Sequence, residues 1–329
     1  MNARQVSGKK RRATALITGI TGFAGSWLAE ELLGLDYQVY GTALPRESCE
    51  NIRHIESELE LTRLNITKAD AVRRLVKQIK PDYILHLAAF ASVGGSFEVE
   101  RVVFDVNFGG ALNLLEAARA DSALKAFLFV SSPDCYGLFK PQNKTLTEEH
   151  PLAPVSPYGI SKAAADHFCR YYHRQYGLPV IVARAFNHTG PRQSPLFVAP
   201  AFAYQIARIE ARRAKPILKV GNLSARRDLS DVRDIVRGYR LLIERGRPGQ
   251  VYQLCSGRAV AIERVLAQLL RLSPINIEVK PDPGRMRPID LPVLRGSNRK
   301  AASEVGFGVR YRLKTTLFET LEYWRAKVK

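Results

Sequence analysis

The fold is decided by one stretch near the N-terminus, residues 13–25, which reads ATALITGITGFAG. Residues 13–18 are a short apolar run ended by glycine, which is typical of a buried parallel strand. The motif G-x-x-G-x-x-G occupies residues 19–25, and a helical apolar pattern follows it and ends at Gly34. Glycines at a turn from strand to helix let backbone N–H groups approach a diphosphate. The stretch therefore predicts a dinucleotide-binding unit.

Strands and helices alternate through the rest of the first half. Apolar runs predict further strands at residues 38–42, 59–64, 83–87, 126–131 and 180–184. Helical patterns lie between them, including a long one at residues 97–119. After residue 185 the alternation breaks down, and the pattern predicts helices at 198–213 and 315–327 and strands at 217–220, 251–254 and 275–279. This order predicts an α/β fold, a Rossmann doubly wound parallel sheet with a smaller C-terminal α/β lobe.

The expected domain boundaries follow from this order. We expect residues 13–185 and 229–256 to form the dinucleotide-binding Rossmann domain, and residues 186–228 and 257–329 to form the smaller C-terminal lobe. The basic residues 1–12 are expected to be a flexible tail, because the apolar run after them is too short for a signal peptide.

Composition limits the classes of function. No apolar run approaches the roughly 18 residues needed to span a membrane. The four cysteines are scattered without a CxxC pair, which predicts reduced thiols in a cytoplasmic protein and no metal site. The net charge of +19 favours anionic partners. Because the excess is spread along the chain, we expect a nucleotide diphosphate rather than nucleic acid as the partner. We also expect the protein to form a homodimer.

A second informative stretch is SPYGISK, residues 156–162. Ser156 before Pro157 marks a helix start, so Tyr158 and Lys162 share one helical face. An ammonium one turn away favours the phenolate and lowers the tyrosine pKa from about 10. The pair then passes a proton to or from an alcohol oxygen.

The predicted strand 126–131 ends at two further polar residues, Ser132 and Asp134. Ligands of doubly wound sheets lie beyond the carboxyl ends of the strands, which places Ser132 to hydrogen-bond a reacting oxygen and Asp134 to act as a base. The predicted catalytic residues are therefore Ser132, Asp134, Tyr158 and Lys162.

The end of the second predicted strand bears on cofactor choice. An NAD-selective site has Asp or Glu there, but this chain has Gly41 and Thr42, and the first carboxylate downstream is Glu47. Since Arg46 is able to pair with a 2′-phosphate, the sequence predicts NADP(H); the alternative is that Arg46 is an ordinary surface residue. The predicted cofactor contacts are Gly19, Thr21, Gly22, Phe23, Ala24, Gly25, Thr42, Arg46, Asn65, Ile66, Leu87, Ala88, Ala89, Asn107, Tyr158 and Lys162.

Together these residues resemble the extended short-chain dehydrogenases/reductases that act on nucleotide sugars, over residues 13 to 325. The stretch RAFNHTGPRQS at 184–194 and the segment 227–236 are similar to the branch of GDP-mannose 4,6-dehydratases and GDP-4-keto-6-deoxymannose reductases. The resemblance implies that the nucleotide sugar is faced by Asn187, Val198, Lys219, Arg227 and Arg287, and we expect Ser92, Arg192 and Asn222 to join them. Arginine forks suit a diphosphate independently of the family.

Within this branch, the run SDVRDIV at residues 230–236 looks more like the reductase. The dehydratases usually have Trp where this chain has Leu229, and a glutamate where it has Asp134. We therefore expect NADPH-dependent reduction of the C4 keto group of GDP-4-keto-6-deoxy-D-mannose to a GDP-6-deoxyhexose of the GDP-rhamnose type, with Tyr158 as proton donor. The alternatives are a GDP-mannose 4,6-dehydratase, an NDP-sugar 4-epimerase and, from another class, an RNA-binding protein regulated by a dinucleotide.

Overall fold

The computed structural model describes residues 11–120, 123–139, 144–286 and 289–328. Most of the predicted basic tail, residues 1–10, lies outside this part, as do Arg287 and Pro288. The two described tail residues, Arg11 and Arg12, pair with Asp82 and Asp36 at the edge of the molecule. No helix in the described part is long and apolar enough to cross a membrane.

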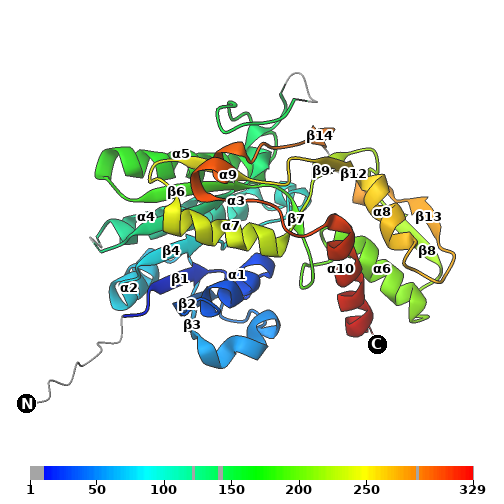
Figure 1. Cartoon of the computed structure of the whole chain (residues 1–329), viewed down its shortest axis with the longest axis horizontal. Coiled ribbons are helices and arrows are strands. Elements are labelled where there is room, and N and C mark those ends of the chain that lie inside the picture. Colours follow the sequence, from blue (N-terminus) through cyan, green and yellow to red (C-terminus); the bar gives the residue numbers. More distant parts are fainter. Residues whose placement is uncertain (1–10, 121–122, 140–143, 287–288, 329) are drawn as a thin grey trace, which may run out of the picture.

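The centre is a seven-stranded sheet in the order β11-β6-β5-β4-β1-β2-β3, and every neighbouring pair is parallel (Figure 1). Its strands are β1 (Thr14–Thr18), β2 (Gln38–Ala43), β3 (Glu60–Arg63), β4 (Tyr83–His86), β5 (Ala126–Ser131), β6 (Val180–Ala185) and β11 (Val251–Leu254). The predicted Rossmann sheet is confirmed. The strand order reverses between β1 and β4, and ligands of such sheets bind at this reversal, beyond the carboxyl ends.

Helices cover both faces of the sheet. One face carries α1 (Phe23–Leu33), α7 (Val232–Arg245) and α9 (Arg299–Val305), and the other carries α2 (Ala69–Ile79), α3 (Glu100–Phe104), α4 (Gly110–Arg119) and α5 (Pro157–Tyr176). A separate apolar cluster fills each side, because strands buried on both faces project apolar side chains in both directions. The helix predicted at 97–119 begins at Glu100 and is interrupted by a π-helical turn, Asp105–Gly109.

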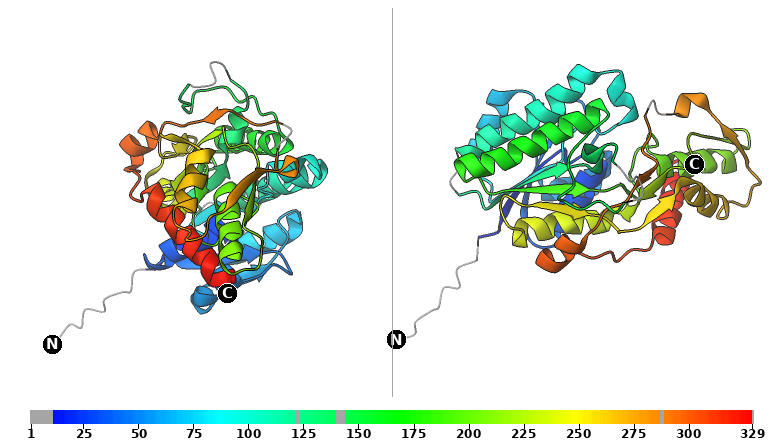
Figure 2. Two further views of the ribbon diagram at one scale, coloured as in Figure 1. Left: turned by 90° about the vertical axis from the view of Figure 1, so that its right-hand side faces the viewer. Right: turned by 90° about the horizontal axis from the view of Figure 1, so that it is seen from above.

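A second group of elements gathers at one end of the molecule (Figures 1 and 2). It contains α6 (Val198–Glu210), α8 (Ile262–Leu270), α10 (Leu313–Val328), and the parallel strands β8 (Ile217–Val220) and β13 (Glu278–Pro281). Their apolar faces form a third cluster of their own. Because that cluster is separate, it supports the predicted two-lobe division, whose boundaries remain a prediction. The strand predicted at 275–279 is misplaced, because Ile275 and Ile277 pack into this cluster before pairing with β8 begins at Glu278.

Short strands connect the two groups. They are β7 (His188–Thr189) paired with β10 (Ser230–Asp231), and β9 (Arg226–Asp228) between β12 (Ala259–Ala261) and β14 (Val293–Leu294). Asp228 is fully buried and accepts hydrogen bonds from the backbone N–H groups of Ser256 and Gly296. This carboxylate therefore ties β9 to the loop after β11 and to the segment that follows β14.

Gly137 joins the turn after β5 to the segment that leads into α5. Its φ is +59°, and an added Cβ would lie 1.7 Å from the carbonyl oxygen of Ala153. Gly177, at the end of α5, has a φ of +69° but nothing within 4 Å of an added Cβ.

Gly137→Ala should therefore lower the free energy of unfolding by about 3 kcal/mol or more, because strain and a backbone clash add, whereas Gly177→Ala should cost about 1 kcal/mol from strain alone. Urea denaturation of both variants measures the difference. Equal losses of unfolding free energy in the two variants would show that the turn at Gly137 rearranges to accept the added methyl group without further cost.

Candidate active site

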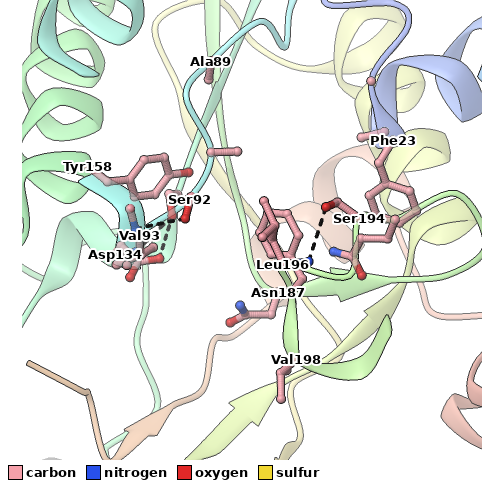
Figure 3. Close-up of a pocket in the computed structure, with 18 of the residues that line it drawn as sticks. Phe23, Ala89, Ser92, Val93, Asp134, Tyr158, Asn187, Ser194, Leu196 and Val198 are labelled. Atoms are coloured by element: carbon pink, nitrogen blue, oxygen red, sulfur yellow. Dashed lines mark hydrogen bonds between the residues drawn. The ribbon is translucent and has the colours of Figure 1, made fainter. Parts of the chain in front are cut away.

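A single cavity of about 1540 Å³ runs from the carboxyl edge of the central sheet to the second group of elements. The glycine-rich turn and the ends of β2, β4 and β5 line one part, and residues from the segments 219–227, 284–286 and 289–291 line the other. In Figure 3, Tyr158, Asp134 and Ser92 lie on one side of this cavity, and Phe23 and Leu196 lie on the other. Among the described residues, no group of three or more His, Cys, Asp or Glu side chains is placed to hold a metal ion.

The glycine-rich turn brings the start of α1 directly to the sheet edge. Gly19 has a φ of +72°, and a Cβ on Gly25 would lie 2.2 Å from the carbonyl oxygen of Gly19. Helix α1 begins without a side-chain cap and without an acidic residue in its first turn. Its N–H groups and dipole are thus available to an anion such as a diphosphate. The predicted contacts of this turn all line the cavity: Gly19, Thr21, Gly22, Phe23, Ala24 and Gly25.

The neighbouring part of the cavity also contains most of the other predicted cofactor residues, namely Thr42, Asn65, Ile66, Leu87, Ala88 and Ala89. Arg46 is an exception, because its side chain is exposed and outside the cavity, while Glu47 lies in the wall. Arg63, at the end of β3, donates to the carbonyl oxygens of Leu44 (3.0 Å) and Glu47 (2.7 Å) and so fixes this loop. Arg46 thus lies beside the cavity and not in its wall, and its contact with a cofactor remains a prediction. The sequence analysis did not identify this role of Arg63, although the carboxyl ends of the adjacent parallel strands β2 and β3 meet at one edge of the sheet.

Asn107 also lies elsewhere than predicted. It sits in the π-helical turn, 1% exposed, and does not line the cavity. Its side chain accepts a hydrogen bond from the backbone N–H of Phe90 (2.8 Å) and donates to the hydroxyl of Ser161 (3.0 Å). Asn107 therefore fixes the backbone after β4 against α5 instead of facing a cofactor, because both of its polar atoms are used by the protein.

Helix α5 presents Tyr158 and Lys162 to the cavity as predicted. Its start is capped by the Ser156 hydroxyl, which accepts from the backbone N–H of Gly159 at 3.1 Å. A single 3₁₀ turn after β5, η4 (Pro133–Tyr136), places Ser132 and Asp134 opposite Tyr158. The Ser132 hydroxyl donates to the Asp134 carboxylate (3.0 Å) and accepts from the Asp134 N–H (3.2 Å). The four predicted catalytic residues are thus brought together, and their roles remain a prediction.

The charges around Tyr158 differ from the prediction. Burial raises the pKa of Tyr158, the nearby Asp134 carboxylate raises it further, and a hydrogen bond with Ser132 lowers it in part. Lys162 does not lower the Tyr158 pKa, because its ammonium donates to the carbonyl oxygen of Val130 (2.8 Å) on β5. The expectation that Lys162 lowers this pKa was therefore wrong for this structure. Tyr158 is held as a neutral phenol, a proton donor.

The cavity wall also contains the described members of the predicted sugar site: Ser92, Asn187, Arg192, Val198, Lys219, Asn222 and Arg227. Arg287 lies outside the described residues. The guanidinium of Arg227 pairs with Asp290 and donates to the carbonyl oxygen of Leu291. Asp290 also accepts from the Asn222 amide at 2.8 Å. Asp290 was missed, although a buried arginine predicts a carboxylate partner nearby.

Arg192 faces helix α1 more than the far part of the cavity. Its guanidinium lies 4.2 Å from the centre of the Trp27 ring and 2.6 Å from a carboxylate oxygen of Glu30. Since the Trp27 indole N–H donates to the carbonyl oxygen of Pro191, these contacts fasten the loop after β7 to the helix that follows the glycine-rich turn.

Lys162 is a buried ammonium without a carboxylate partner among the residues that the structure describes. Burial lowers the pKa of Lys162 to about 8. Below that pH the charged ammonium is buried in the folded protein, and this lowers the free energy of unfolding. The loss disappears as the pH rises from the folded-state pKa toward the pKa of lysine in the unfolded chain. Lys162→Met should therefore raise the free energy of unfolding of the cofactor-free protein by about 1–3 kcal/mol at pH 7, with no gain near pH ~10.5.

Urea denaturation at the two pH values measures this effect, with exposed Lys77→Met as the matched control that should change little. A loss of stability at pH 7 in Lys162→Met would show that the site stabilises the charge.

Known protein families and proteins resemble this chain over most of its length. The family model described as GDP-mannose 4,6 dehydratase matches residues 16–320. A GDP-6-deoxy-D-mannose reductase of Pseudomonas aeruginosa is 30% identical over 313 residues, which cover 95% of this chain and 97% of that protein. GDP-mannose 4,6 dehydratase 2 of Arabidopsis thaliana is 32% identical over 314 residues, which cover 90% of this chain and 82% of that protein.

Solved structures agree with the sequence comparison. RMD from Pseudomonas aeruginosa, complexed with NADPH, superposes with a TM-score of 0.83 at 29% identity, covering 96% of this chain and 100% of that chain. A UDP-glucose 4-epimerase from Thermotoga maritima, with UDP-glucose, gives a TM-score of 0.85 at 26% identity, with the same coverage of 96% and 100%. The resemblance seen in the sequence is confirmed. The chain belongs to the GDP-mannose 4,6-dehydratase family of extended short-chain dehydrogenases/reductases that act on nucleotide sugars.

Proposed function

We propose that the protein reduces the C4 keto group of GDP-4-keto-6-deoxy-D-mannose with NADPH. The observation that carries this proposal is the position of Tyr158 in the cavity wall together with Ser132 and Asp134. Burial and the Asp134 carboxylate both raise the pKa of Tyr158, so at neutral pH the phenol carries the proton that a reduction consumes. A reductase needs an acid at this position from the start, whereas a dehydratase or an epimerase must first remove a proton from the C4 hydroxyl.

The residues act as follows in this proposal. The bound dinucleotide supplies a hydride to the carbonyl carbon. The Tyr158 hydroxyl donates its proton to the oxygen that becomes an alkoxide, and the Ser132 hydroxyl hydrogen-bonds the same oxygen. Lys162 binds the ribose next to the nicotinamide and keeps its ammonium against the β5 carbonyl of Val130. The product is a GDP-6-deoxyhexose of the GDP-rhamnose type.

NADP(H) is the proposed cofactor. The Pseudomonas aeruginosa neighbour is complexed with NADPH, and β2 ends in Gly41, Thr42 and Ala43, without a carboxylate to hold an unphosphorylated ribose. The Glu47 carboxylate in the wall is occupied by the backbone N–H of Leu44 at 3.0 Å. Comparing kcat/KM for NADPH and NADH tests this proposal, and a preference for NADH would contradict it.

The substrate site is proposed from the family and from the charge of the far wall. Names of the relatives point to GDP-sugars. Lys219, Arg227 and Arg285 line this wall. Each pairs with a carboxylate, Asp282 or Asp290, and a diphosphate would compete with these carboxylates for the three cations. Competition by GDP tests the assignment: GDP should compete with the sugar substrate, and failure to compete would move the nucleotide elsewhere.

The 4,6-dehydratase is the second candidate. Asp134 lines the cavity beside Tyr158 and is therefore placed to remove a proton from a sugar carbon. A dehydratase takes no net reductant, because the hydride returns to the same sugar. This difference separates the two activities in one assay. The third candidate, an NDP-sugar 4-epimerase, likewise consumes no reductant.

We also propose that the protein is a homodimer. The exposed apolar side chains of α3 and α5 form one face, which includes Val102, Phe104, Phe168, Tyr171 and Tyr176. Ring contacts connect this face through Phe108. A helical face of this kind can pair with its own copy about a twofold axis. A monomer mass in sedimentation equilibrium would contradict the proposal.

The proposed compartment is the cytoplasm. All four cysteines, Cys49, Cys135, Cys169 and Cys255, are free, as expected where thiols stay reduced. Fractionation of native cells tests this, and recovery outside the cytoplasm would contradict it.

The proposed role of Tyr158 gives a paired prediction. Tyr158→Phe removes the proton donor but keeps the ring, so kcat should fall by about 10²–10⁴-fold with little change in substrate binding. Asp134→Asn should cost far less in a reductase. The kcat of an enzyme that uses a general acid falls as the pH rises through the pKa of that acid. Since the Asp134 carboxylate raises the pKa of Tyr158, Asp134→Asn should shift the alkaline fall of kcat to lower pH.

Initial rates across pH on the 4-keto-6-deoxy sugar and on GDP-mannose measure both effects, with exposed Glu149→Gln as the control that leaves the profile in place. Conversion of GDP-mannose without added reductant, lost in Asp134→Asn, would establish the dehydratase instead.

A further inference from the structure

Tyr239 is a buried tyrosine on α7 that forms part of the cavity wall. Its side chain is 0% exposed, it lines the cavity, and its hydroxyl has no hydrogen-bond partner among the residues that the structure describes. Buried polar groups in native proteins almost always have a partner, and an unmet one costs stability. A hydroxyl in this situation indicates a partner that comes from outside the chain.

The other buried tyrosines show that this situation is unusual. The Tyr136 hydroxyl contacts Arg184 and Gln253, and the Tyr252 hydroxyl accepts from the Arg247 N–H and donates to Glu304. The Tyr37 and Tyr172 hydroxyls donate to carboxylates. None of these four tyrosines lines the cavity. Among the buried tyrosines of the described part, Tyr239 alone combines an unpaired hydroxyl with a place in the cavity wall.

The position of Tyr239 identifies the part of the cavity that it faces. Tyr239 packs in the cluster that contains Leu128 of β5 and Ala185 of β6, on the sheet face that α7 covers. Tyr158 reaches the same carboxyl edge from α5, on the opposite face. The two phenols are close enough that charge on Tyr158 raises the pKa of Tyr239, which burial has already raised. Tyr239 is therefore a neutral hydroxyl near the reacting atoms.

The direction of the dinucleotide follows from the sheet. The glycine-rich turn at the end of β1 suits the diphosphate, and the ends of β2 and β3 lie on one side of it. The ends of β5 and β6, with Tyr158 and Lys162, lie on the other side, where the reactive ring must be. A carboxamide on that ring offers both a donor and an acceptor to a hydroxyl.

We propose that the Tyr239 hydroxyl hydrogen-bonds the carboxamide of the nicotinamide ring and so positions the ring beside Tyr158. This inference rests on the proposed dinucleotide-dependent function. Tyr239 acts through the position of the ring and takes no proton from the substrate, since its pKa keeps it neutral.

Tyr239→Phe tests the proposal, because it removes only the hydroxyl. In the cofactor-free protein the hydroxyl has no partner to lose, so stability to urea should be unchanged or higher. The dissociation constant of NADPH, measured by calorimetry, should rise about 3- to 10-fold, the loss of one neutral hydrogen bond. Binding of 2′-phospho-ADP-ribose, which lacks the nicotinamide, should be unchanged.

Tyr252→Phe is the matched control. Its hydroxyl is buried and paired, and it lies outside the cavity, so its loss should lower stability without changing NADPH affinity. Lower stability of Tyr239→Phe with unchanged NADPH affinity would overturn the proposal and indicate a trapped water. Equal weakening of NADPH and 2′-phospho-ADP-ribose would overturn it too, because the contact would then lie away from the ring. If the wild-type protein binds no dinucleotide, the proposed function fails instead.

Discussion

The arrangement of the catalytic residues depends on a buried ion pair between Arg184 of β6 and Asp166 of α5. Arg184 is 2% exposed and donates two hydrogen bonds to the Asp166 carboxylate, at 2.9 and 3.2 Å. It also donates to the Tyr136 hydroxyl, at the end of the turn that carries Asp134. Such a pair tolerates burial only when its geometry and hydrogen bonds are complete, as they are here. The sheet, helix α5 and the turn after β5 are therefore held in one register.

That register explains the chemistry of the site. Asp166 lies two turns beyond Tyr158 and one beyond Lys162, so all three share a face of α5. Fixing Asp166 against β6 directs the Lys162 ammonium to the β5 backbone and buries Tyr158 opposite Asp134. The ammonium is thus a binding group for the cofactor ribose in our proposal, while the carboxylate keeps the phenol protonated. In our proposal the phenol thus carries the proton that the reduced sugar oxygen takes up.

The sequence predicted what local patterns determine. The glycine-rich turn at 19–25 and the capped start of α5 rest on contacts between residues close in the chain, and the alternation of strands and helices that predicts the parallel sheet is also a local pattern. The sequence did not show that Arg63, from another strand, fixes the loop that carries Arg46. Tyr239 was missed, because its place in the cavity comes from packing of α7 on the sheet. Such long-range placements leave no periodic signal in a single sequence.

The reductase that we propose transfers a hydride from NADPH to the sugar and does not take it back, whereas a dehydratase returns to the sugar the hydride that its cofactor took from it. The most direct measurement supplies NADPH carrying deuterium at the transferable position, together with GDP-4-keto-6-deoxy-D-mannose, and locates the label by NMR. We expect deuterium at C4 of the 6-deoxyhexose and one NADP⁺ released for each sugar converted. A product without label at C4, or sugar conversion without release of NADP⁺, would contradict the proposal.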